Sequence, residues 1–284
     1  MKKAETVAAL LQEARKALFD ADIEMSALDA RLLLQAASGL SHEAAIAEPD
    51  HRLTTEQILN FRNFVNRRLA HEPVSRILGQ REFFGRSFQV TKAVLDPRAD
   101  TEALIELTLE LIDDRFVEVL DIGTGSGAII VTLLAERPQL TATAVDLSQD
   151  SLQVAEQNAL ANDVSGRIKF HQGSWFEGLK QKFDLIVSNP PYIPHGDIAN
   201  LEIDVREHDP HMALDGGQDG LVAYRAIASG APAHLNSRGL IIVEIGAGQG
   251  EDVKAIFASH GFQLLKQKYD LGGHLRALAF ERAN

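Results

Sequence analysis

The tetrapeptide Asn189-Pro190-Pro191-Tyr192 has the residue types needed to hold a planar amino group. It follows an apolar run, residues 183–188, that is typical of a buried strand. Because two prolines cannot continue a strand ladder, the chain must turn where this strand ends. The Asn side-chain carbonyl and a prolyl carbonyl can accept both hydrogens of one NH2 group, while the Tyr ring stacks on its plane. The motif predicts a site for an amide, adenine or cytosine amino group; the alternative is an ordinary proline-rich turn.

A glycine-rich loop follows the first expected strand, residues 117–122, and precedes a helical pattern. Glycines permit positive φ and let the backbone approach a ligand, and the helix N-terminus behind them offers free N–H groups. Because part of the loop also fits the loose dinucleotide pattern G-x-G-x-x-G/A, the loop alone leaves NAD and S-adenosyl-L-methionine open. The residues expected to bind the cofactor here are Gly123, Thr124, Gly125, Ser126 and Gly127.

Two further residues follow neighbouring strands and suit either cofactor. Asp146 ends the second strand, where a carboxylate can accept hydrogen bonds from two vicinal ribose hydroxyls. Its alternative role is to cap the helix that begins near Ser148. Trp175, the only tryptophan, follows the third strand and either covers an adenine ring or packs in the core.

The amino-group site decides between the two cofactors. Hydride transfer from NAD requires a hydride acceptor and usually an acid, whereas the motif at Asn189 is suited to holding an NH2 group. The combination favours transfer of a methyl group from the sulfonium of S-adenosyl-L-methionine to nitrogen, with Asn189 beside both cofactor and substrate.

Residues 117–281 alternate between strand and helix patterns, which predicts an α/β, doubly wound and mostly parallel sheet. The last two strands are separated by a connection too short for a crossover, so we expect them to pair antiparallel. This arrangement resembles the class I (Rossmann-like) methyltransferase fold with a seven-stranded sheet. The expected strands are 117–122, 141–146, 167–172, 183–188, 239–245, 262–269 and 275–281.

The chain before this sheet divides into two parts. Residues 1–75 have helical apolar spacing and predict a small helical domain for substrate recognition. One helix is expected to open at Ser26, with Asp29 in its first turn, and to end at Gly39; another is expected to begin with a capping box at Thr54 and Gln57. Residues 76–95 predict a hairpin linker. Residues 96–284 then form the expected methyltransferase domain.

Composition narrows the classes of partner. The net charge is −12, and nine basic and eleven acidic residues lie in residues 1–75, so we expect no direct nucleic-acid partner. Arg62, Arg67 and Arg68 are the nearest approach to a basic patch, and a solvated helix face is the expected explanation. With no cysteine and no apolar run of spanning length, we expect no membrane partner and a cytoplasmic location. His208 and His211 flank a probable loop, and no metal site is expected.

Two further segments accompany these motifs, and the whole chain resembles the HemK/PrmC family of release-factor glutamine methyltransferases. Residues 97–102, Pro-Arg-Ala-Asp-Thr-Glu, are similar to the family's P-R-x-[DE]-T-E signature. Residues 207–221 are similar to its E-P-x-x-A-L-x-G-G-x-D-G-L segment. The resemblance covers essentially the full length.

The resemblance implies an S-adenosyl-L-methionine-dependent protein-(glutamine-N5) methyltransferase. Its substrate would be the glutamine of the Gly-Gly-Gln loop of peptide-chain release factors, held by Asn189 to Tyr192. The Gly123 to Gly127 loop and Asp146 would hold the cofactor, with Trp175 near its adenine. The alternatives are an N6-adenine DNA or RNA methyltransferase using the same site on a flipped base, and a non-catalytic adaptor. Oligomeric state stays open.

Overall fold

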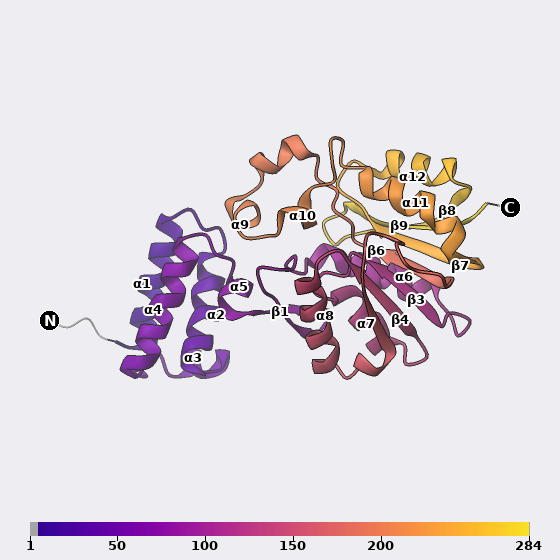
Figure 1. The fold of residues 1–284 in the computed structure, drawn as a ribbon. Coiled ribbons are helices and arrows are strands. Elements are labelled where there is room, and N and C mark those ends of the chain that lie inside the picture. The colour runs from indigo at the N-terminus through magenta and orange to yellow at the C-terminus, as the bar shows by residue number, and fades with distance from the viewer. Residues whose placement is uncertain (1–4, 284) are drawn as a thin grey trace. The chain divides into compact units, whose positions relative to one another are not determined.

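The computed structural model describes residues 5–283, which fall into two compact units. The first unit comprises the chain up to Gly79 together with Ile203–His208, and the second comprises the remainder. Within residues 5–283, no helix is both long and apolar enough to cross a bilayer. The main helices of the first unit are α1 (Val7–Asp20), α2 (Ser26–Ser38), α3 (His42–Ala47), α4 (Thr55–Leu69) and α5 (Val74–Leu78) (Figure 1).

Local capping explains where two of these helices begin and end. Thr54 and Gln57 form the predicted capping box at the start of α4, each side chain bonding the other residue's backbone N–H. Gly39 ends α2 in the left-handed conformation, with φ of 74°. α2 begins at Ser26 as expected, and Met25 occupies the cap position without a side-chain hydrogen bond. Asp29, one turn later, enters a buried ion pair.

That ion pair centres on Arg68, which is buried rather than solvated as the sequence suggested. Its Nε atom donates to Asp29 Oδ2 at 2.7 Å, and its Nη1 atom lies 2.8 Å from Asp204 Oδ2. Asp204 belongs to α9 (Ile203–Arg206), in the separate segment Ile203–His208 that is part of the first unit. A charge taken out of water needs such partners, and the two carboxylates supply them.

The second unit contains a seven-stranded sheet of the predicted topology. Its strand order is β5-β4-β3-β6-β7-β9-β8, with parallel pairing from β5 to β7 and antiparallel pairing of β9 with both of its neighbours. The strands are β3 (Glu118–Ile122), β4 (Thr141–Asp146), β5 (Ile168–Gln172), β6 (Phe183–Ser188), β7 (Leu235–Glu244), β8 (Phe262–Tyr269) and β9 (Leu275–Arg282).

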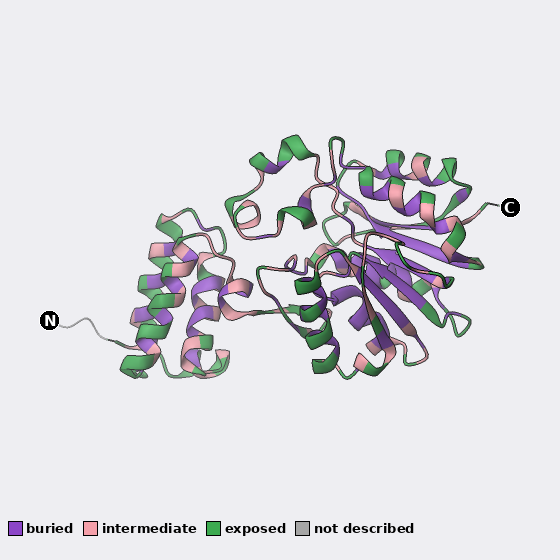
Figure 2. Cartoon of the chain, in the orientation of Figure 1, coloured by how far each residue is buried: buried purple, intermediate pink, exposed green. Residues whose placement is uncertain are grey.

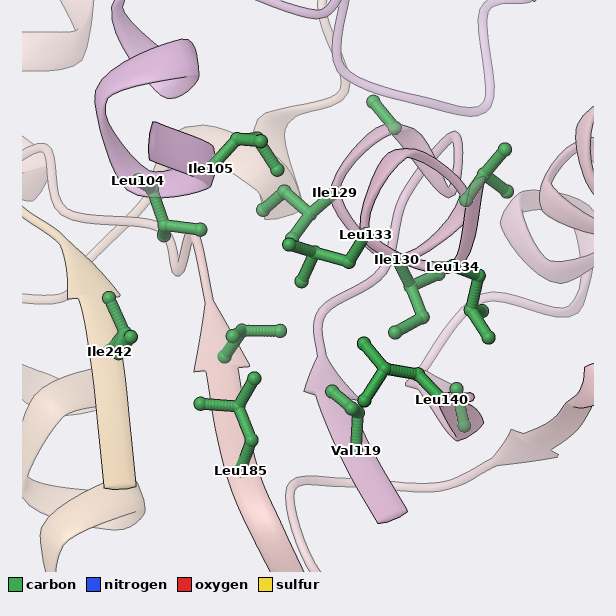
Figure 3. Close-up of a cluster of buried hydrophobic side chains, with 14 of the residues drawn as sticks. Leu104, Ile105, Val119, Ile129, Ile130, Leu133, Leu134, Leu140, Leu185 and Ile242 are labelled. Atoms are coloured by element: carbon green, nitrogen blue, oxygen red, sulfur yellow. The ribbon is translucent and has the colours of Figure 1, made fainter. Parts of the chain in front are cut away.

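Apolar side chains bury both faces of this sheet, as Figure 2 shows by the burial of the central strands. On one face, Val119, Leu185 and Ile242 pack against Leu104 and Ile129 of the covering helices (Figure 3). On the other face, a second cluster joins the sheet to α11 and α12. The helices are α6 (Glu102–Leu111), α7 (Ala128–Glu136), α8 (Gln149–Ala161), α11 (Val222–His234) and α12 (Gly250–Ser259).

The expected hairpin is present as β1 (Gln80–Phe83) and β2 (Arg86–Gln89), paired antiparallel. Phe83 and Phe88 meet edge to face with ring centroids 6.0 Å apart, and both belong to the core cluster around α6 and α7. The hairpin is thus packed as part of the second unit.

The buried ion pair of Arg68 predicts that removing one partner lowers the stability of the first unit. Asp29→Ala is expected to lower the local free energy of unfolding by about 3 kcal/mol, because it removes one of two partners from a buried guanidinium. Native-state hydrogen exchange of the α2 and α4 amides measures this change. Asp20→Ala, which breaks an exposed pair with Lys16, is the control and is expected to change it by less than about 1 kcal/mol. Equal effects of the two variants would contradict the role assigned to Arg68.

Candidate active site

A cavity of about 460 Å³ lies at the carboxyl ends of β3, β4 and β6. Parallel strands end at the same sheet edge, so the loops that follow them meet there. Its wall includes the glycine-rich loop, Asp146, Trp175 and Asn189, so the structure brings together residues predicted from four separate loops. The volume is in the range that binds a small organic cofactor.

The conformation of the glycine-rich loop depends on three of its glycines. Gly123, Gly125 and Gly127 have φ of 72°, 55° and 79°, a region that favours glycine. A side chain at Gly127 would place its Cβ 3.2 Å from the Ala155 Cβ, so glycine also allows α7 and α8 to pack closely. At Gly123 and Gly125 an added Cβ would meet no atom within 4 Å.

Asp146 ties this loop to the end of β4. Its Oδ2 atom accepts the Gly125 N–H at 2.9 Å, and its Oδ1 atom accepts the Ser148 N–H at 2.9 Å. Burial raises the pKa of Asp146, while these backbone N–H groups lower it. A carboxylate offers about four acceptor positions, so at least one remains for a ligand. The Ser148 hydroxyl itself caps α8, accepting the Ser151 N–H at 3.2 Å.

Asp121 stands behind the loop at the end of β3 and is fully buried. Its Oδ2 atom accepts the Thr124 hydroxyl at 2.6 Å, while its Oδ1 atom has no partner among residues 5–283. Burial raises the pKa of Asp121 to about 7, with the nearby Asp146 charge acting in the same direction. Asp121 stands two residues before Gly123, and nothing in the sequence predicted this environment.

The position of Trp175 is compatible with both roles that the sequence left open. It lines the cavity, and it also packs against the apolar cluster under α11. Its φ of 52° is unusual for a bulky side chain, and such strained residues concentrate at ligand sites.

The Asn-Pro-Pro-Tyr segment divides between cavity and core. Asn189, Pro190 and Pro191 line the cavity, and Asn189 Nδ2 donates to Thr101 Oγ1 at 3.1 Å. Tyr192 is not among the lining residues; its ring packs against the apolar cluster. Burial, together with the nearby Glu244 carboxylate, raises the pKa of Tyr192 to about 12, so its hydroxyl stays protonated.

The conformation of this segment depends on the glycines at 216–220. The Gly216 N–H donates to the Ile193 carbonyl at 2.8 Å, and the Ile193 N–H donates to the Leu214 carbonyl at 3.0 Å. An added Cβ at Gly216 would lie 2.8 Å from the Tyr192 backbone, and one at Gly220 would collide with the Tyr192 carbonyl oxygen. Only glycine permits this approach, which gives a physical reason for the two glycine positions.

Two more contacts complete the site, and neither was predicted. Gln249 Nε2 donates to the Tyr192 carbonyl at 2.9 Å and to the Gly220 carbonyl at 3.3 Å. Arg98, in the cavity wall, forms an ion pair with the buried Asp209 and so joins the two signature segments. Arg98 and Asp209 lie in motifs that the sequence analysis described, but the spacing of those motifs does not indicate a contact across 111 residues.

The fold and the site define a class I S-adenosyl-L-methionine-dependent methyltransferase. The residues fit this cofactor, because the glycine loop leaves open space for it and the Asp146 carboxylate keeps a free acceptor position beside the cavity. Solved structures share the fold. The catalytic domain of hMettl16 aligns with a TM-score of 0.57 at 19% identity, over 76% of this chain and 82% of that one. A methyltransferase from Pyrococcus furiosus aligns with a TM-score of 0.51 at 19% identity, over 78% and 99%.

The sequence comparisons are more specific. Residues 9–79 match the family model described as the PrmC N-terminal domain, and residues 98–228 match the methyltransferase small domain. A release factor glutamine methyltransferase of Agrobacterium fabrum is 43% identical over 98% of each chain. Another, of Cereibacter sphaeroides, is 43% identical over 95% of this chain and 96% of the relative. The chain therefore belongs to the release factor glutamine methyltransferase family, and S-adenosyl-L-methionine is its cofactor.

The contacts of Asp146 lead to a test of cofactor binding. Asp146→Ala is expected to weaken S-adenosyl-L-methionine binding at least tenfold, because it removes a charged acceptor worth about 1.5–3 kcal/mol. Isothermal titration calorimetry measures the affinity. Glu156→Ala removes the same charge from the exposed side of α8 and is the control, expected to change little. Unchanged binding by the Asp146 variant would show that the ligand does not use this carboxylate.

The approach of Gly220 to Tyr192 leads to a second test. Gly220→Ala is expected to lower methyl transfer at least tenfold while leaving cofactor affinity nearly unchanged, because its Cβ displaces the Tyr192 carbonyl but not the glycine-rich loop. Gly248→Ala is the matched control: its φ of 84° carries a similar strain, and its Cβ would meet no atom within 4 Å. Equal losses in the two variants would assign the effect to backbone strain alone.

Proposed function

We propose that the chain transfers a methyl group from S-adenosyl-L-methionine to the side-chain amide nitrogen, N5, of the glutamine in the Gly-Gly-Gln loop of peptide-chain release factors. The observation that carries this proposal is the position of Asn189 and Pro190 in the wall of the cofactor cavity. Family membership supplies the substrate class, since its close relatives bear the name of that activity.

The chain's own residues act chiefly by positioning. An amide nitrogen is a poor nucleophile, because its lone pair is delocalised into the carbonyl. The Asn189 side-chain carbonyl and the Pro190 backbone carbonyl accept the two N–H groups and fix the nitrogen. Orientation of this kind contributes several kcal/mol, up to roughly 7–11 in the best intramolecular cases. The bound cofactor supplies an electrophilic methyl group on a sulfonium.

The same two acceptors favour the positive charge that develops on nitrogen during transfer. No side chain has to remove a proton beforehand, because methylation acidifies the nitrogen and water takes the proton afterwards. Pro191 lines the cavity beside Asn189 and Pro190, and the Tyr192 ring, which packs against the apolar cluster, anchors the segment.

The helical unit is proposed to recognise the folded release factor away from the Gly-Gly-Gln loop. A short Gly-Gly-Gln peptide lacks any surface for this unit, so its kcat/KM is expected to be far below that of the whole factor. Equal efficiencies would remove the recognition role from the helical unit and leave the active site unaffected.

The test of function uses labelled S-adenosyl-L-methionine with a purified release factor, its Gln→Ala variant in the Gly-Gly-Gln loop, and a DNA control. Label is expected on the wild-type factor alone. Label on DNA alone would favour an N6-adenine methyltransferase. No transfer to any of the three, with cofactor binding confirmed, would favour an adaptor.

Within this assay, Asn189→Ala is expected to lower kcat by about 10²–10³, the cost of removing one preorganised electrostatic contact. Cofactor affinity, measured separately by calorimetry, is expected to change much less, because the glycine loop and Asp146 are untouched. Near-normal turnover by this variant would refute the assignment of Asn189.

A further inference from the structure

The side-chain amide of Asn189 has a donor end and an acceptor end, and the reaction needs the acceptor end to face the substrate. Its Nδ2 atom donates to Thr101 Oγ1 at 3.1 Å. Within residues 5–283, no hydrogen bond to its Oδ1 atom accompanies this contact. Thr101 therefore holds the donor end and leaves the carbonyl free. Thr101 is itself buried, at the start of α6.

A threonine hydroxyl alone does not fix this orientation, because it donates one hydrogen as readily as it accepts another. Glu244 supplies the missing constraint. It is the last residue of β7 and is 1% exposed, and it lies close enough to the Thr101 hydroxyl and the Asn189 side chain for both groups to lower its pKa. Its Oε2 atom has no hydrogen-bond partner in the described part of the chain. An ionised carboxylate only accepts hydrogen bonds, so it draws the single hydroxyl hydrogen of Thr101 toward itself.

We propose that Thr101 and Glu244 are positioning residues that hold the Asn189 side chain with its carbonyl toward the substrate amide. With its hydrogen committed to Glu244, Thr101 offers only lone pairs to Asn189, and the Asn189 NH2 group must face it. The inference rests on the proposed function, because it assigns a productive orientation to the group that binds the glutamine amide.

Protonation of Glu244 reverses the direction of its hydrogen bond with Thr101. A protonated carboxyl donates to Thr101, whose hydroxyl hydrogen then points to Asn189 and favours the opposite amide orientation. Burial raises the pKa of Glu244 to about 7, the nearby Asp100 charge also raises it, and Arg276 lowers it. Tyr192 and Tyr224 face the same carboxylate, and their own raised pKa values keep them neutral at this pH. Turnover is therefore expected to increase as pH rises through about 7.

The first test removes the hydroxyl with almost no change in shape. Thr101→Val is expected to lower kcat at least tenfold with little change in cofactor affinity, and Thr101→Ser, which keeps the hydroxyl, is expected to restore most of it. Thr108→Val is the matched control on the same helix: its buried hydroxyl donates to the Leu104 carbonyl at 2.7 Å, away from the cavity. Normal turnover by Thr101→Val, or equal losses with Val and Ser, would overturn the proposal.

The second test follows the pH profile of kcat. Glu244→Gln keeps the size of the side chain but adds a donor that does not titrate, so turnover is expected to be low and the rise near pH 7 is expected to vanish. Asp121 also has a pKa of about 7 and is the competing source of such a rise. Persistence of the rise in Glu244→Gln would assign it to Asp121 and remove Glu244 from the proposal.

A binding measurement separates this inference from the proposed function. With S-adenosylhomocysteine present, the wild-type enzyme is expected to bind the release factor more tightly than its Gln→Ala variant, and Thr101→Val is expected to lose this difference. If the wild-type enzyme neither distinguishes the two factors nor methylates either, the proposed function fails. If it does both and Thr101→Val behaves in the same way, only the positioning role fails.

Discussion

The Asn-Pro-Pro-Tyr segment cannot hold its own conformation, and the rest of the site is arranged around that constraint. Two consecutive prolines remove two backbone N–H donors at the point where β6 leaves the sheet. The carbonyl of Tyr192 is instead bound by Gln249, and the next residue, Ile193, pairs with the strand-like segment before Gly216. Thr101 fixes the side chain of Asn189 from a third direction. Three segments distant in sequence therefore supply what this loop lacks.

Buried carboxyl groups at the sheet edge carry a cost in stability. Burial raises the pKa of both Asp121 and Glu244 to about 7, above the usual values for these residues. The folded state therefore binds protons that the unfolded chain has released, so stability falls as pH rises from about 4 to about 7. Replacement by apolar residues would remove this cost. Asp121 supports the glycine loop through Thr124, and Glu244 lies beside Asn189, so each acid is placed where the site requires an acceptor.

Local sequence signals predicted the fold well, because strand patterns and caps depend on near neighbours. The expected strands 141–146, 183–188 and 262–269 have the observed bounds, and the Thr54–Gln57 capping box is present. The sequence indicated Asp29 only as a residue of the first turn of α2, because its partner Arg68 lies 39 residues away. The same limit applies at the site. Glu244 interrupts an apolar strand, which is a visible signal, but only the sheet pairing places it beside a loop from β6.

The segment Ile203–His208 determines how the chain connects the two units. After Glu202 the chain leaves the catalytic unit, contributes Ile203–His208 to the helical unit, and returns at Asp209. Asp204 in this excursion is one of two carboxylates that pair with the buried Arg68. The excursion therefore supplies a charge that stabilises the buried guanidinium of the helical unit. Asp209, immediately after it, pairs with Arg98 in the cavity wall. The chain therefore passes between the two units after Gly79, after Glu202 and after His208, and the buried ion pair of the helical unit needs a segment from outside the chain up to Gly79.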